Sequence, residues 1–211
     1  RNSIFINRNG TTWELELSSN TNKQRNTYVT GFEERAKSET YARLRYNFSN
    51  TVAAQFFLSA FQLNSNTENF LDRNYQIKGF KFEPQLTFFL NKNARLTTQY
   101  KFKSAQNILK TEGEQLTLNE LSTEFTLNAA KSSQVRAKIT GTVVNFVNGE
   151  ANGATGFAIL EGLQNGNNFI WNLTYDKSLS QNLLLSLSYE GRNLGAAPVS
   201  HVGRMQIRAS F

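Results

Sequence analysis

"HVGRMQIRASF", residues 201–211, alternates between two kinds of side chain along its length. Because successive side chains of a β-strand point to opposite faces, this alternation predicts a strand with two chemically different faces. Two structures have such strands: a soluble sheet with one face in water, and a membrane barrel with lipid outside and polar side chains inside. One face of this strand carries Met205, Ile207, Ala209 and Phe211, and the other carries Arg204, Gln206, Arg208 and Ser210.

The same alternation recurs from one end of the chain to the other, in segments of about ten residues as barrels show. We predict about ten full strands and a shorter N-terminal one, with no helix standing out. Pro84 indicates a bulge or weak pairing, and residues 51–61 are apolar on both faces, which leaves their register open. The predicted strands lie in 2–7, 11–18, 40–48, 51–61, 79–90, 96–103, 120–127, 135–143, 168–176, 182–192 and 201–211.

The connections between these segments alternate in length. Short turns on one side and long loops on the other are typical of outer-membrane barrels, in which the long loops lie outside the cell. A sandwich has no reason to keep this alternation. The short connections are 47–51, 90–94, 129–133 and 177–182, and the long ones are 19–35, 64–74, 104–114, 147–167 and 193–200.

The composition is compatible with a barrel. Of 211 residues 39% are hydrophobic, and the mean hydropathy is −0.47. No run reaches the roughly 18 apolar residues of a membrane helix, but a barrel places its apolar residues at alternate positions, so its mean hydropathy looks soluble. The absence of cysteine excludes disulfides and thiolate zinc sites. The start, "RNSIFINRNG", has no signal-peptide pattern. We therefore expect one barrel domain over 1–211, either a mature or trimmed chain or the C-terminal part of a longer one.

The C-terminal residues of the chain resemble those of a known class of proteins. A terminal aromatic preceded by alternating apolar residues resembles the C-terminal signature strand of bacterial outer-membrane proteins, which the outer-membrane assembly machinery reads in that family. Residues 160–192, followed by 201–211, resemble the end of large surface proteins of Bacteroidota. The resemblance implies an outer-membrane location, with lipid, the assembly machinery and other envelope-complex subunits as partners. It leaves the role open among channel, anchor and assembly subunit. The predicted assembly signature is Phe211, Ala209, Ile207 and Met205.

The polar face of the predicted strands is heavily charged. In a narrow barrel such groups pair across strands and close the interior. The basic excess alternatively favours an anion-selective pore, and a third possibility is a lumen filled by another segment or subunit. The residues predicted to face the lumen are Arg43, Arg45, Lys81, Glu83, Lys101, Lys103, Glu120, Glu124, Arg136, Lys138, Asp176, Glu190, Arg192, Arg204 and Arg208, together with Glu14 and Glu16.

The sequence gives little support for nucleic-acid binding, catalysis or phosphate binding. The net charge of +7 does not indicate nucleic-acid binding, because cations spread around a barrel interior form no continuous stripe for phosphates. His201 is the only histidine, and no motif links it to a nucleophile or a carboxylate pair. The glycine-rich residues 149–156 lack the lysine of a phosphate loop and predict a mobile surface loop. We expect no cofactor, metal site or enzymatic activity.

The sequence thus predicts an all-β, antiparallel up-and-down transmembrane β-barrel of about ten to twelve strands in the bacterial outer membrane. Its expected role is a membrane anchor or scaffold, or a transport subunit of an envelope complex. The alternatives are a porin-like channel with a mixed-charge, basic-leaning lumen, and a soluble β-sandwich binding module. The aromatic residues expected at the membrane interface are Trp171, Tyr175 and Tyr189.

Overall fold

The computed structural model describes residues 1–7, 12–29, 31–129 and 132–209. They form one antiparallel sheet of eleven strands, in which each strand lies beside its neighbours in the sequence. The predicted all-β, up-and-down architecture is confirmed, as are ten long strands and a short first one. The strands are β1 (Asn2–Ile6), β2 (Trp13–Tyr28), β3 (Gly31–Asn47), β4 (Val52–Thr67), β5 (Tyr75–Phe89), β6 (Ala94–Asn107), β7 (Gln115–Ala129), β8 (Ser133–Val147), β9 (Gly166–Ser180), β10 (Leu183–Leu194) and β11 (Ser200–Ala209).

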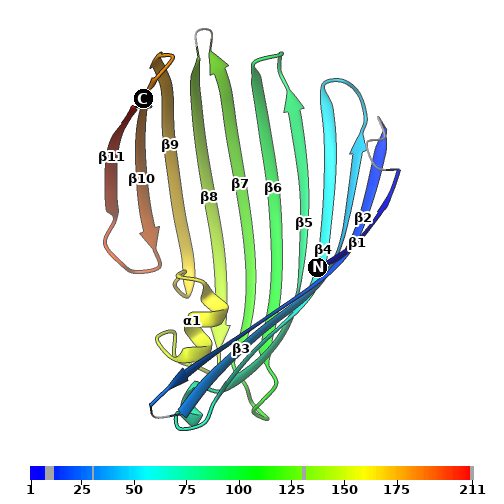
Figure 1. Ribbon diagram of the computed structural model, residues 1–211, viewed down its shortest axis with the longest axis vertical. Coiled ribbons are helices and arrows are strands. Elements are labelled where there is room, and N and C mark those ends of the chain that lie inside the picture. The colour runs from blue at the N-terminus through cyan, green and yellow to red at the C-terminus, as the bar shows by residue number, and fades with distance from the viewer. Residues whose placement is uncertain (8–11, 30, 130–131, 210–211) are drawn as a thin grey trace.

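The sheet is strongly curled, with short turns at one end and longer connections at the other (Figure 1). Local polar side chains close two of the short turns. The hydroxyl of Ser49 accepts hydrogen bonds from the amides of Thr51 and Val52, both at 3.2 Å. The side chain of Asn91 accepts from the amides of Asn93 and Ala94 at 2.8 and 2.9 Å. Serine and asparagine favour turns for this reason, and the short connections predicted at 47–51 and 90–94 are confirmed.

The prediction of a long loop at 19–35 is wrong. β2 and β3 stay paired as far as Tyr28 and Gly31, so most of that segment is a long hairpin. Its side chains are polar on both faces, and ion pairs such as Lys23–Glu34, at 2.9 Å, join the two strands. A strand with water on both faces lacks the apolar alternation that identifies strands in sequence.

Two helical segments interrupt the β-structure: a 3₁₀ turn, η1 (Leu71–Arg73), and a helix, α1 (Ala154–Leu160). α1 corrects the prediction of a surface loop at 149–156, since residues 154–156 begin this helix, which did not stand out in the sequence. Gly156 lies so close to Glu150 that a Cβ would overlap the carbonyl oxygen of that residue. The glycines therefore serve close packing of this connection.

The two faces of the sheet exchange character halfway along the strands. In the half that ends in the short turns, here the short-turn half, large apolar side chains such as Leu58 and Leu121 are exposed on the convex face. In the opposite, long-loop half, the apolar side chains lie on the concave face instead. β4 shows the switch within one strand, since Leu58 is convex and exposed while Phe61, three residues on, is concave and buried. Ala53 and Phe57 also lie on the concave face, and together with Phe61 they explain the ambiguous register of 51–61.

α1 packs against the concave face of the long-loop half. The helix contributes Ile159 and Leu160, which are 1% and 3% exposed. Together with side chains from β4 to β8 they form the main apolar core of the described residues. That core consists of Phe61, Ile77, Ala105, Leu116, Leu118, Val144, Phe146, Ile159 and Leu160.

The sheet is curled but not closed. Within the described residues, β1 pairs only with β2, and β11 pairs only with β10. Met205, Ile207 and Ala209 of the predicted assembly signature lie on the convex face of β11, in register with Leu187, Leu185 and Leu183. Ser210 and Phe211 fall outside the described residues.

Candidate functional site: the concave face

The strand registers place every charged residue predicted to face the lumen on the concave side of the sheet. Across β2 and β3, for example, Glu16 lies opposite Arg43, and across β7 and β8 Glu124 lies opposite Lys138. The concave set is Arg43, Arg45, Lys81, Glu83, Lys101, Lys103, Glu120, Glu124, Arg136, Lys138, Asp176, Glu190, Arg192, Arg204 and Arg208, with Glu14 and Glu16.

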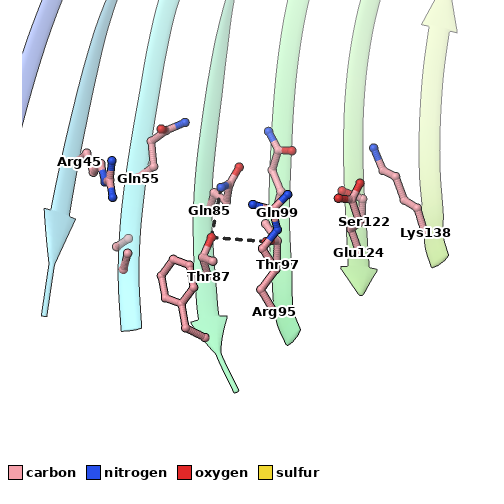
Figure 2. A pocket seen from close by; sticks show the side chains of 13 residues that line it. Arg45, Gln55, Gln85, Thr87, Arg95, Thr97, Gln99, Ser122, Glu124 and Lys138 are labelled. Carbon is pink, nitrogen blue, oxygen red and sulfur yellow. Dashed lines mark hydrogen bonds between the residues drawn. The ribbon is translucent and has the colours of Figure 1, made fainter. Parts of the chain in front are cut away.

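A polar hollow of about 360 Å³ occupies the concave face of the short-turn half (Figure 2). A cross-strand row of Gln55, Gln85, Gln99 and Ser122 runs across it, each residue in register with the next on β4 to β7. Amides and hydroxyls supply both donors and acceptors, so this wall suits polar solutes or water. The labelled side chains of the hollow are Arg45, Gln55, Gln85, Thr87, Arg95, Thr97, Gln99, Ser122, Glu124 and Lys138.

One carboxylate organises the concave side near β1. Glu16 is 1% exposed and accepts a charge-assisted hydrogen bond from Arg43. Arg1 donates to the same carboxylate at 2.8 Å, and the Tyr41 hydroxyl donates at 2.7 Å. A buried carboxylate is tolerated only with such partners. The charged groups in this part of the concave face therefore neutralise one another by ion pairing.

A second ion-pair cluster centres on Glu39. Lys81 and Lys37 lie 3.2 and 3.4 Å from its carboxylate, and Ser59 donates to it at 3.1 Å. The pairing therefore spans three strands, β3 to β5. Smaller groups lie further round the sheet: Arg136 with Glu124 at 3.8 Å, Ser186 with Asp176 at 2.6 Å, and Arg192 with Glu190.

The hollow itself keeps a basic excess. Of its charged lining residues Arg45, Arg95, Lys138 and Glu124, the three cations form no ion pair with any described residue. Lys101, nearby on β6, forms none either within the same residues. Cations facing a polar hollow favour anions over cations there. The concave face thus combines a paired region and a basic one.

Lys103 fastens α1 to the sheet. Its ammonium donates to the carbonyl oxygen of Ile159 at 3.0 Å and to the carboxylate of Glu161 at 2.7 Å. The side chain is 2% exposed, so the loss of either partner would leave a buried charge poorly satisfied. The alternation along β6 predicts Lys103 on the polar face, but no pattern indicates its partner Glu161, which follows the helix.

A buried amide fastens the neighbouring connection. Asn107 donates to the carboxylate of Glu114 at 2.7 Å and, at 3.5 Å, to the hydroxyl of Thr155 on α1. Its side-chain oxygen accepts from the amides of Gln76 and Leu109 at 3.0 and 3.2 Å. No sequence pattern indicates this cluster, because its members come from the ends of strands and from predicted loops.

Acid is expected to loosen α1. Burial raises the pKa of Glu161, but the Lys103 ammonium more than offsets this, so the pKa lies below its ordinary value of 4.5. Burial likewise raises the pKa of Glu114, and hydrogen bonds from its own backbone and Asn107 bring it below the ordinary value. With folded-state pKa values below those of the unfolded chain, this stabilisation is complete above pH 4.5 and is lost as the pH falls through the lowered pKa values.

Hydrogen exchange of the α1 amides at pH 7 and pH 3 measures this effect. The opening free energy, corrected for intrinsic exchange, should fall in acid for the wild type. It should change little for the double variant Glu114→Gln/Glu161→Gln. The same acid response in both proteins would contradict the assignment.

The convex face carries an aromatic cluster on β9 to β11. The ring of Trp171 lies 5.4 Å from that of Phe169 and 5.9 Å from that of His201. His201 also forms a 2.8 Å hydrogen bond with the hydroxyl of Tyr189 and stacks on its ring. The register puts Tyr175, the third predicted interface aromatic, on the same face opposite Leu187. His201 is therefore part of this aromatic cluster, in which it contacts Trp171 and Tyr189.

Gly191 lies directly across from Trp171, and a Cβ there would overlap the indole. Gly191→Ala should displace the ring and lower the free energy of unfolding by about 1–3 kcal/mol through overpacking. Tryptophan emission in a Trp13→Phe background, where Trp171 is the only tryptophan, reports the displacement. Gly203→Ala is the control, because nothing lies within 4 Å of a Cβ at Gly203. Equal shifts in emission for both variants would refute the packing of this cluster.

The described residues gather no group of three or more histidine and acidic side chains that could hold a metal ion. No helix in this part of the chain is long and apolar enough to cross a membrane.

Several solved structures are similar to the chain at low sequence identity, among them three chains of bacterial proteins. No family profile and no curated protein matches the sequence. The β-domain of the Bordetella autotransporter Brka is 13% identical, with 96% of this chain and 85% of that one covered and a TM-score of 0.49. The translocator domain of the autotransporter NalP from Neisseria meningitidis is 9% identical, with 94% and 75% covered and a TM-score of 0.46. CdiB from Acinetobacter baumannii is 14% identical, with 95% and 48% covered and a TM-score of 0.41. These values establish no family for the chain.

Proposed function

We propose that the chain is part of an integral β-barrel of the bacterial outer membrane. The observation that carries this proposal is the pair of faces in the short-turn half. There the convex face exposes large apolar side chains on strands across the sheet, such as Leu58 of β4, Leu121 of β7, Ile139 of β8 and Ile207 of β11 at 53–58% exposure. The concave face opposite them is charged and polar. Lipid outside and a polar interior account for both faces, whereas in water so broad an apolar surface favours aggregation.

The exchange of apolar side chains from the convex to the concave face, halfway along the strands, indicates which half of the sheet lies in the membrane. In the long-loop half the convex residues are polar, as with Gln62, Lys78 and Gln106 in one cross-strand row. We place this half outside the lipid, where water covers the convex face and α1 covers the concave one. The long connections then lie on the cell exterior and the short turns in the periplasm, as in known barrels.

The proposed role is a membrane anchor or scaffold, or a transport subunit of an envelope complex, with no enzymatic reaction assigned. α1 and the connections around it narrow the interior at the exterior end, which favours a scaffold over an open pore. The terminal resemblance favours a surface protein of Bacteroidota, delivered by the outer-membrane assembly machinery that would read the strand ending in Phe211.

Flotation with lipid vesicles tests the membrane location. The chain, refolded in the presence of vesicles, should float with them and remain bound after a carbonate wash, because its convex face is buried in lipid. The same chain should aggregate in detergent-free buffer. A monodisperse chain in plain buffer that stays with the soluble fraction would refute the proposal and favour a soluble β-sheet module.

A second candidate is a passage that prefers anions. It is favoured by the hollow in which Arg45, Arg95 and Lys138 have no ion pair among the described residues. Planar-bilayer recordings in a KCl gradient test it. A steady current whose reversal potential indicates chloride preference, and which weakens in Arg95→Gln, would support the passage. Silent bilayers with vesicle-bound protein would favour the scaffold.

A further inference from the structure

The two edges of the sheet cannot close on each other in the usual way. Consecutive strands alternate in direction, so β1 and β11, both odd-numbered, run the same way, each towards the short-turn end. Direct pairing of β1 with β11 would be parallel. Bacterial single-chain barrels close with an even number of strands, because an antiparallel sheet closes on itself only then.

Leaving the edge of β11 open is costly in lipid. The strand spans Ser200–Ala209, which is the length of a membrane-crossing strand of about 9–11 residues. Every second residue on an edge turns its N–H and C=O groups outward, and each unpaired group costs several kcal/mol where water is absent. This step rests on the proposed membrane location.

The concave side of β11 indicates what kind of strand lies beside it. Arg204 and Arg208 face Ser188 and Leu184 of β10, so their one neighbour offers them no carboxylate. Neither arginine forms an ion pair in the described part of the chain. Elsewhere on the concave face, some cations lie opposite an acid on a neighbouring strand, as Arg43 does with Glu16, Lys101 with Glu120 and Lys138 with Glu124. Others, such as Arg95, Arg136 and Arg192, face neutral residues on both sides. Because β10 offers Arg204 and Arg208 no acid, charge complementarity on the open side of β11 favours a neighbouring strand that carries carboxylates.

We infer that the gap between β11 and β1 is filled by an odd number of strands from a segment of different sequence. The first of these strands runs antiparallel to β11 and carries carboxylates at two concave positions four residues apart, opposite Arg204 and Arg208. A second copy of residues 1–211 does not fit. If both copies share one orientation in the membrane, β11 meets β1 of the next copy in parallel. Antiparallel pairing of two β11 edges would turn one copy upside down.

Disulfide trapping with a synthetic peptide tests this inference. The protein is Gln206→Cys, which places one thiol on the concave side between the two arginines in a chain without other cysteines. The probe is an eleven-residue alternating peptide with leucine and valine at convex positions and a Glu-x-Cys-x-Glu centre at concave ones. The comparison peptide has Lys-x-Cys-x-Lys. Directly opposed cysteines on antiparallel strands have a geometry that a disulfide can bridge.

Vesicle-bound protein should form the mixed disulfide about tenfold more with the glutamate peptide, since two cross-strand charge pairs change from repulsive to attractive. Arg204→Glu/Arg208→Glu, in the same Gln206→Cys background, should reverse the preference. Ser122→Cys is the control, because it lies on the concave face of β7, which is paired on both sides. It should trap neither peptide.

Three results would overturn the inference: equal trapping of both peptides, no reversal by the charge swap, or a dominant disulfide between two copies of the Gln206→Cys protein. Flotation of the same samples separates this failure from that of the membrane proposal. If the protein floats with the vesicles but forms no mixed disulfide with either peptide, only the inference of a neighbouring acidic strand is refuted. Protein that does not float refutes the membrane location first.

Discussion

Leu121→Arg is expected to lower the free energy of unfolding in lipid vesicles by about 1–2 kcal/mol, because the cost of an arginine on the lipid face decreases from the bilayer midplane towards the interface, and Leu121 is the last convex apolar residue of β7 before the faces exchange. Leu121 lies near the middle of β7, on the convex face, and is 57% exposed. Its cross-strand neighbours are Tyr100 and Gly141, neither of which can neutralise a guanidinium. In water an exposed leucine tolerates this change, so a cost of this size identifies lipid as the solvent of that face.

Ser122→Arg, one residue along, is the matched control. Ser122 is 5% exposed and lies on the concave wall of the hollow, where Glu124 also lies. An arginine there meets a polar environment and a carboxylate, and should cost much less than at Leu121. Reversible urea unfolding of both variants in vesicles gives the comparison. Equal losses, or the opposite order, would refute the assigned faces of β7 and, with them, the membrane band.

Ile159→Ala should lower the opening free energy of α1 by about 2–5 kcal/mol, the usual cost of truncating a buried isoleucine. The side chain is 1% exposed in the core between the helix and the concave face. Because α1 has only seven residues, it has little stability of its own and depends on this packing. The loss should therefore appear as detachment of the helix.

Phe157→Ala, in the same helix, is the control because Phe157 is 77% exposed. It should leave the opening free energy nearly unchanged, although it removes more atoms than Ile159→Ala does. Native-state hydrogen exchange of the α1 amides distinguishes the two. If Phe157→Ala loosened the helix as much as Ile159→Ala, the contact of α1 with the concave face would be disproved.

Properties that depend only on neighbouring residues could be predicted from the sequence. Strand alternation is a local property, because it needs only that successive side chains point to opposite faces. It predicted the strands, their order of direction, and the side of the sheet on which Arg43, Lys101 and Glu124 lie. The short turns were equally local, since residues such as Ser49 and Asn91 close them through hydrogen bonds to amides two or three positions away.

What covers each face of the sheet, and where along the strands this changes, depends on contacts between distant segments and was not predicted. The strands keep one register past Leu58 and Leu121, but beyond them the apolar residues are the concave Phe61 and Leu118, because α1 covers that side. Alternation in sequence shows that the two faces of a strand differ, but it does not show whether lipid, water or another segment of the chain covers each face. For the same reason, the sequence predicts a loop at residues 19–35, although most of them form a hairpin whose two faces are both exposed to water. The contacts of Lys103 with Glu161 and of Asn107 with Glu114 depend on how the connections fold back, which no local pattern encodes.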